Sequence, residues 1–155
     1  MKSSSFHLLA IILVFLVSGC ASVEVASQLD SLKAKEFGSP GPGNAGVYLY
    51  RNRGLIGVAL KKDLWIDGEC IGETSPAVFF YTEVEGDKNH TIATESEFSP
   101  NELVLFFESG KNYFIRQFMK LGVFVYGAGI EQIPEEQGKE EVAKLEMAIP
   151  GKCSK

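Results

Sequence analysis

The chain contains few of the residues that bind metals or act in catalysis. Its 155 residues include three cysteines and two histidines, and no pair of cysteines has the C-x-x-C spacing of a zinc site. No serine lies in the Gly-x-Ser-x-Gly elbow of hydrolases. We interpret His90, the one histidine beyond the first 19 residues, as a turn-flanking residue. The sequence therefore predicts no metal site, no cofactor and no catalytic residue, and we expect a protein that is not an enzyme.

Basic charge and long apolar runs are also scarce. The chain carries 15 Lys and Arg against 20 Asp and Glu, a formal net charge of −5. Phosphate neutralisation supplies most of the affinity for nucleic acids, so this composition argues against nucleic acid as a partner. Beyond residues 6–17, no stretch approaches the roughly 20 apolar residues that a membrane-spanning helix needs.

The N-terminus is basic, then apolar, and then ends in small residues before a cysteine. Lys2 precedes the apolar run 6–17, and Val17-Ser18-Gly19-Cys20 follows. The run suits a signal peptide better than a membrane span. The segment resembles the lipobox of bacterial lipoproteins, which implies cleavage before Cys20 and lipidation of Cys20. The alternative is a plain signal peptide with an incidental cysteine.

This resemblance implies an address as well as a modification. A lipid on Cys20 would make the membrane a partner and place the chain in the bacterial cell envelope. Ala21 and Ser22 follow the cysteine where an Asp would signal retention in the inner membrane. In a Gram-negative host the expected location is therefore the outer membrane, facing the periplasm.

Composition divides the chain into three parts. Residues 1–19 are the expected signal peptide, and residues 20–44 are the expected lipidated N-terminus and flexible linker. Gly38-Ser39-Pro40-Gly41-Pro42-Gly43-Asn44 cannot belong to a helix interior or a central strand. Residues 45–155 form one predicted globular domain, which is a usual size for a single core.

The domain reads as a series of short strands separated by turns. Strands spaced at 8–12 residues with Gly- and Asn-rich turns favour a sandwich or barrel over a parallel α/β sheet. We predict a mainly β fold, an antiparallel sandwich of about seven or eight short strands, with one C-terminal amphipathic helix over 135–147. The expected strands lie near 47–51, 55–60, 63–67, 69–72, 77–83, 90–95, 103–107, 113–118 and 123–130. Asp67-Gly68 is the expected hairpin turn.

Four pieces in this order resemble a known family. They are Val47-Tyr48-Leu49-Tyr50-Arg51, the segment 64–72, Gly86 through Ile92, and the segment 110–116. Their order and spacing are similar to the domain of unknown function 2846 family, small β-rich domains common in bacterial lipoproteins. Two of the pieces are also similar to the PEGA sandwich module, although Asp87 departs from its proline-glycine turn. The resemblance implies a fold and an envelope location, and it carries no activity.

Cys70 and Cys153 remain as a candidate pair once Cys20 is lipidated. An oxidising compartment and an even number of remaining cysteines favour a disulfide. Such a bridge would attach the C-terminal tail to the Asp67-Gly68 hairpin. The alternative is two separate thiols.

Four further residues are candidates for a partner surface. Arg51 and Arg116 lie in or beside apolar strands, either as rim residues whose stems pack or as charged anchors for a partner or an acidic neighbour. Adjacent aromatic residues in a strand point to opposite faces of the sheet, so one of each pair lies away from a single core. Phe79 and Phe107 are the candidates for this second face. Either the C-terminal helix covers the second face, which we favour, or an apolar patch is exposed.

The sequence therefore favours a lipid-anchored, non-catalytic β-sandwich that binds or supports another envelope component. The alternative is a small-ligand or glycan-binding module that uses Trp65 and the tyrosines as stacking surfaces. The partner, an envelope protein or a glycan, is not identified by any motif.

Overall fold

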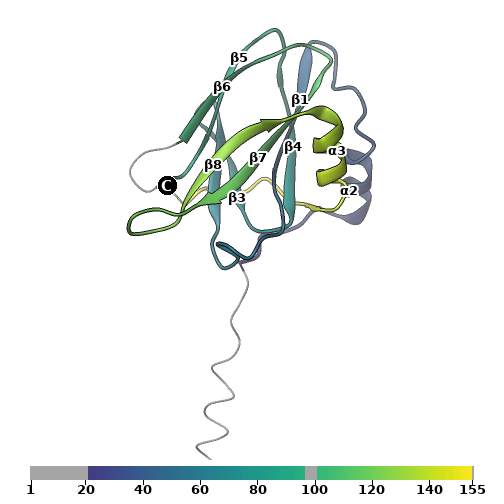
Figure 1. The fold of residues 1–155 in the computed structure, drawn as a ribbon. Helices are drawn as coiled ribbons and strands as arrows, with labels where there is room; N and C mark the ends of the chain where they lie inside the picture. Colours follow the sequence, from purple (N-terminus) through teal and green to yellow (C-terminus); the bar gives the residue numbers. More distant parts are fainter. Residues whose placement is uncertain (1–20, 97–100, 155) are drawn as a thin grey trace, which may run out of the picture.

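The structure, a computed structural model, describes residues 21–96 and 101–154. Two packed β-sheets form a sandwich, with two short helices beside the larger sheet (Figure 1). The larger sheet has the strand order β8-β7-β1-β4-β9, and the smaller has the order β3-β2-β5-β6. The elements are α2 (Gln28–Ala34), β1 (Asn44–Arg51), β2 (Lys62–Ile66), β3 (Glu69–Thr74), β4 (Val78–Glu85), β5 (Lys88–Thr94), β6 (Asn101–Phe107), β7 (Asn112–Lys120), β8 (Gly127–Ile133), α3 (Glu135–Val142) and β9 (Glu146–Met147). The predicted mainly β sandwich with a C-terminal helix is confirmed.

β1 lies at the centre of the larger sheet and is buried along almost its whole length. Val47 and Leu49 point into the core between the sheets, and Tyr48 and Tyr50 point to the outer face. β1 pairs antiparallel with β4 and parallel with β7. The larger sheet is therefore mixed, where the sequence predicted antiparallel pairing throughout.

The Asp67-Gly68 turn between β2 and β3 forms as predicted. Asp67 has φ 51° and Gly68 has φ 81°, the left-handed pair that a two-residue type I′ hairpin requires. The Asp67 carboxylate accepts a bond from the Thr91 N–H at 2.8 Å and lies 2.6 Å from Nδ1 of His90. His90 is buried, and its other ring nitrogen lies 2.7 Å from the Glu85 carbonyl oxygen. It is a packed turn-flanking residue, as interpreted.

Three predicted elements need correction. Residues 55–60 form a turn rather than a strand, because two glycines, Gly54 and Gly57, interrupt the apolar run. The last long strand begins at Gly127, and residues 121–126 form an exposed loop. The helix ends at Val142, since the chain then turns to pair Glu146 with Val78 of β4.

The prediction of a flexible linker over residues 20–44 is also wrong for residues 21–44, the part that the structure describes. Ser27 caps α2 by accepting a bond from the Asp30 N–H, and Phe37 packs into the outer core. Val25 forms a bridge with Ala148. The proline- and glycine-rich stretch crosses the sheet as ordered chain because its backbone and Asn44 bond to Glu83. The predicted signal peptide and Cys20 lie outside the described residues.

Candidate functional site

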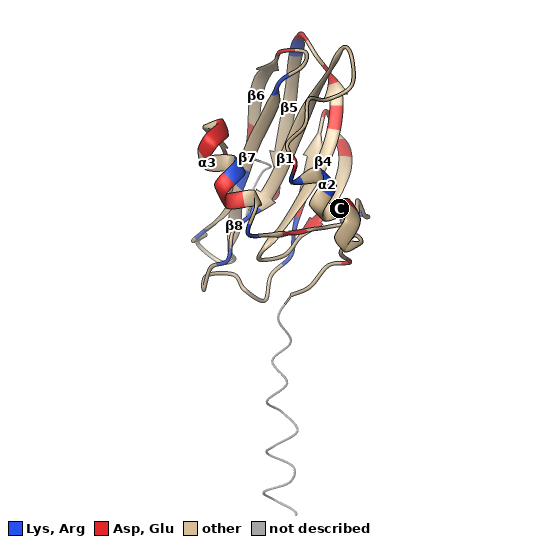
Figure 2. Cartoon of the chain, turned by 90° about the vertical axis from the view of Figure 1, so that its right-hand side faces the viewer, with Lys and Arg blue, Asp and Glu red and all other residues tan. Residues whose placement is uncertain are grey.

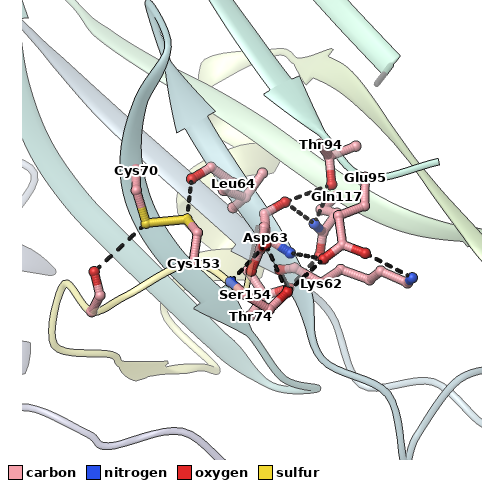
Figure 3. Close-up of a disulfide and its surroundings, with 11 residues drawn as sticks. Lys62, Asp63, Leu64, Cys70, Thr74, Thr94, Glu95, Gln117, Cys153 and Ser154 are labelled. Atoms are coloured by element: carbon pink, nitrogen blue, oxygen red, sulfur yellow. Dashed lines mark hydrogen bonds and ion pairs between the residues drawn. A yellow bond between two sulfur atoms is a disulfide. The ribbon is translucent and has the colours of Figure 1, made fainter. Parts of the chain in front are cut away.

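The C-terminal tail is joined to the smaller sheet by a disulfide. Cys70 on β3 and Cys153 are bonded, with their Cα atoms 5.9 Å apart (Figure 3). Backbone hydrogen bonds hold the part of the tail that precedes Cys153. The Gly151 N–H donates to the Ile71 carbonyl, and the Ile149 N–H donates to the Glu24 carbonyl. The tail therefore ties β3 to the N-terminal segment.

A buried polar cluster lies beside the disulfide, between the two sheets. Gln117 on β7 reaches into it, and its Nε2 donates to Thr94 Oγ1 at 2.7 Å. Thr74 Oγ1 contacts Gln117 Oε1 and lies 3.0 Å from the Lys62 carbonyl oxygen. Thr74, Thr94 and Gln117 are all buried, so their bonds replace those lost to water. This cluster links one strand of the larger sheet to three of the smaller sheet.

Asp63 forms the tail side of this cluster. Its Oδ2 accepts bonds at 2.9 Å from both the backbone N–H and the hydroxyl of Ser154. Burial raises the pKa of Asp63, and the charge of Glu95 acts in the same direction, against the hydrogen bonds from Ser154. Within the described residues, its Oδ1 is buried with no hydrogen-bond partner. The tail covers this carboxyl, so its arrangement suits tail attachment rather than proton transfer to a substrate.

Arg116 is the centre of an ionic network on the outer face. It contacts Glu131 of β8 at 2.9 Å and Glu141 of α3 at 3.1 Å. Glu141 also accepts bonds from the Tyr50 hydroxyl at 2.9 Å and from Asn52 at 2.7 Å. Arg116 thus serves an acidic neighbour, one of the two anchor roles weighed from sequence. Its charge is paired inside the domain, and contact with a partner stays a prediction for this side chain, which is 27% exposed.

The prediction that Arg51 belongs to a partner surface is wrong. Its guanidinium is buried and donates to the Gly57 carbonyl at 2.6 Å and to the Leu60 carbonyl at 2.8 Å. Burial lowers the pKa of Arg51. The side chain therefore fixes the loop between β1 and β2, a role that no local sequence pattern indicated.

Phe79 and Phe107 are both buried, so neither forms an exposed patch. Phe79 packs on the outer face with Val142 and Leu145, the cover by the C-terminal segment that the sequence favoured. Phe107 lies between the sheets, with its ring centroid 5.3 Å from that of His90. Exposed apolar side chains gather in the loops 54–58 and 121–126, which the strand predictions missed, and others lie on α2 and β6. Glycines in both loops were the available sign.

An open groove of about 460 Å³ lies between α2 and the edge of the larger sheet. Tyr48, Tyr81 and Glu83 line it together with Lys33. The Tyr81 hydroxyl donates to Glu83 at 3.0 Å, and burial together with that contact raises the pKa of Tyr81 to about 12. Trp65 is half-buried on β2, in the other sheet, so the predicted stacking residues are not brought together.

Comparison with known proteins places this fold in a family. The family model described as "Protein of unknown function (DUF2846)" matches residues 42–129. The chain belongs to the DUF2846 family. An uncharacterized protein of Haemophilus influenzae is 54% identical to it over 134 residues, which cover 86% of this chain and 79% of the relative. No solved structure matches the chain.

The DUF2846 match covers β1 to β7 and ends inside β8. The resemblance to the domain of unknown function 2846 family is therefore confirmed. The match includes Cys70 and Arg116, whereas α3, Glu141 and Cys153 lie beyond it. In residues 21–96 and 101–154, no group of three or more His, Cys, Asp or Glu is placed to hold a metal ion. No helix in those ranges is both long and apolar enough to cross a membrane.

Proposed function

We propose that this DUF2846 protein is a lipid-anchored protein of the bacterial cell envelope whose β-sandwich binds or supports another envelope component without catalysis. In a host with two membranes, the proposed location is the outer membrane, facing the periplasm. The observation that carries the proposal is the combination of the lipobox-like Cys20 with a domain closed by the Cys70–Cys153 disulfide. Disulfides persist in oxidising compartments such as the periplasm, which agrees with export.

The non-catalytic part of the proposal is supported by the state of the polar groups. His90 is buried between Asp67 and the Glu85 carbonyl, and both of its ring nitrogens are engaged. Asp63 is covered by the tail, and Arg116 is paired with two carboxylates. General acid–base catalysis needs a titratable group within reach of a substrate. These three groups are committed to holding strands, a helix and the tail together.

The anchor is tested by intact-mass analysis of the full chain expressed in a bacterium. We expect a mature chain that begins at Cys20 and carries the added mass of its lipid. A Cys20→Ser variant is the matched control and is expected to lack that mass and to leave the membrane fraction. A mature chain that begins at Ala21, or an unmodified Cys20, would contradict the proposal.

The binding role is tested separately, by crosslinking in intact envelopes. We expect a reproducible partner of the wild-type chain that is lost when Cys20→Ser removes the anchor. Reproducible absence of any partner, with the anchored chain present at normal levels, would contradict the binding role and leave the anchor standing.

The groove beside α2 favours a second candidate function, binding of a small ligand or glycan. Half-buried Tyr81 offers aromatic surface there, and Lys33 and Glu83 offer charge. Ligand sites typically combine apolar walls with a few placed polar groups. In a glycan-array screen, Tyr81→Ala should abolish binding, whereas Val104→Ala, on the other sheet, should not. Equal binding by both variants would exclude the groove.

A further inference from the structure

Two loops of the sandwich carry exposed apolar side chains. In the loop between β1 and β2, Leu55 is 95% exposed and Ile56 is 54% exposed. In the loop between β7 and β8, Leu121 is 77% exposed and Phe124 is 83% exposed. Apolar side chains that gather in this way mark an interaction site more often than scattered single residues do. We call residues 54–58 and 121–126 the end loops.

The end loops leave the same end of the sandwich. β1 and β7 run parallel, with Arg51 beside Gln117, so the loops that follow these strands emerge at the same edge. Gly57 lies against Met119, because a Cβ on Gly57 would fall 2.8 Å from Met119 Cε. Figure 1 shows both loops at the lower end of the molecule, where the described chain also begins.

The first end loop is held in place by the domain beneath it. Buried Arg51 donates to the carbonyl oxygens of Gly57 and Leu60, and the Leu60 N–H donates to Gly57. Leu55 and Ile56 are therefore held outward by a fixed backbone. A preorganised loop spends less conformational entropy on docking than a mobile one.

The start of the described chain contacts this loop. The Ala21 N–H donates to the Val58 carbonyl at 3.3 Å. Cys20 directly precedes Ala21 in the sequence. A lipid on Cys20 therefore enters the bilayer beside Leu55 and Ile56, with no spacer between the lipid and the loop.

Charge differs between the two ends of the sandwich. Residues 52–61 contain Arg53 and Lys61 and no acidic residue, and residues 121–126 are uncharged. Lys61 pairs with Glu73 of β3 at 3.4 Å, so Arg53 is the basic residue that bears on this argument. The opposite end carries Glu83 and Glu85 on β4, and Glu85 pairs with Lys88 at 2.5 Å. Both red and blue segments lie at the top of Figure 2. Apolar residues next to basic ones are the pattern that suits an anionic lipid surface.

We propose that the end loops dock on the lipid bilayer, with Leu55, Ile56 and Leu121 inserted at the boundary between headgroups and acyl chains. Interfacial apolar faces of this kind bury about 5–10 Å deep. This inference rests on the proposed lipidation of Cys20, which makes the docking intramolecular and therefore effective even when each contact is weak. The domain then stands on the membrane by this end and presents its opposite, acidic end to the periplasm.

The test uses the full lipidated chain in vesicles of phosphatidylethanolamine and phosphatidylglycerol, with or without bromine on the acyl chains. Trp65→Phe removes the single tryptophan, and Leu55→Trp introduces a reporter in the first end loop. Val104→Trp is the matched control, because Val104 is 61% exposed on β6, away from the end loops. We expect bromine to quench the Leu55→Trp emission several-fold more strongly than the Val104→Trp emission.

A second measurement needs no substitution. Photoactivatable groups on the acyl chains of the same vesicles should crosslink the native chain at residues 54–58 and 121–126, and not at 104–107. Equal quenching of both reporters, or none, together with no preference in crosslinking, overturns the docking. Emission of Leu55→Trp that shifts with protein density but not with bromine assigns the loops to a second copy of the chain and also overturns it.

Failure of the proposed function is distinguishable from failure of the docking. Intact mass of the same samples reads the lipid on Cys20 directly. A lipidated chain without preferential quenching contradicts the docking alone, whereas an unmodified Cys20 contradicts both.

Discussion

The two faces of the larger sheet are both buried, but they are built from different side chains. The inner face presents Val47, Leu49, Phe80 and Ile115 to the smaller sheet. The outer face presents aromatic rings, which Phe37, α3 and Leu145 cover; these rings are Tyr48, Tyr50, Phe79 and Phe114. A sheet that alternates aliphatic and aromatic residues along one strand can therefore support two cores at once.

The two faces are also closed in different ways. The inner side is closed by the covalent Cys70–Cys153 bridge and the Gln117 cluster. The outer side is closed by polar ties from the sheet to the helices, with the Tyr48 hydroxyl on the Ala34 carbonyl at 2.8 Å and the Tyr50 hydroxyl on Glu141 at 2.9 Å. The inner closure constrains the unfolded chain, whereas the outer closure acts only in the folded one.

Adjacent phenylalanines test whether the outer face is a full core. Phe79 and Phe80 are both fully buried, on opposite faces. Phe79→Ala and Phe80→Ala should each lower the free energy of unfolding by about 3–5 kcal/mol, because each leaves a cavity among packed side chains. Urea unfolding measures both. A cost for Phe79→Ala below about 1 kcal/mol, with the full cost for Phe80→Ala, would show that the outer layer contributes little.

The disulfide tests the inner closure. The double variant Cys70→Ser, Cys153→Ser should lose about 2–5 kcal/mol, because the bridge closes a loop with a sequence separation of 83 residues. Urea unfolding with and without reductant measures the loss, and reductant should leave the double variant unchanged. Wild-type protein that unfolds at the same urea concentration in both conditions would contradict the prediction.

The sequence predicts the parts of this fold that local chemistry decides. Adjacent aromatics indicated that a strand has two apolar faces, and the Asp67-Gly68 pair predicted the hairpin, whose left-handed dihedral angles the structure shows. The cysteine count favoured the Cys70–Cys153 pair over two separate thiols once Cys20 was predicted to carry the lipid. Each of these depends on neighbours within a few residues or on composition alone.

The remaining features depend on contacts between distant segments. For residues 55–60, Gly57 was a local sign of a loop, but the bonds from buried Arg51 to the Gly57 and Leu60 carbonyls could not be predicted from the sequence. Phe37 lies in a stretch read as a linker, and it is ordered only because the outer face offers Tyr48 and Phe114 to pack against. No sequence feature of β1 or β7 indicates that these two strands pair in parallel. Tertiary packing overrides local preference at these positions.

Gly138 tests how tightly α3 lies on the outer face. Alanine favours a helix by about 1 kcal/mol over glycine, so propensity alone predicts that Gly138→Ala stabilises. A Cβ there would lie 2.3 Å from Phe114 Cγ, inside the packed ring. The clash should prevail and lower the free energy of unfolding by about 1–3 kcal/mol. Glu140→Ala, at an exposed position of the same helix, is the control, and equal stabilisation by both variants would contradict the close packing.

The pH dependence of Glu141 tests the polar tie of the outer face. Burial raises the pKa of Glu141, but bonds from Gln137, Asn52 and Tyr50 and the charge of Arg116 together lower it below its usual 4.5. A carboxyl with a lowered pKa in the folded state adds stability above its unfolded value, and this stability is lost as the pH falls through the folded value.

Glu141→Gln should therefore cost about 1–2 kcal/mol near neutral pH and progressively less below about pH 4. Urea unfolding of wild type and variant, near neutral pH and below about pH 4, measures how the cost of the substitution changes with pH. Glu140→Gln, on the exposed side of α3, is the control. A cost that stays constant with pH would mean that Glu141 acts through packing alone. The outer face would then be held by the packing of its aromatic rings, and the ionic tie would add nothing to the contrast with the inner face.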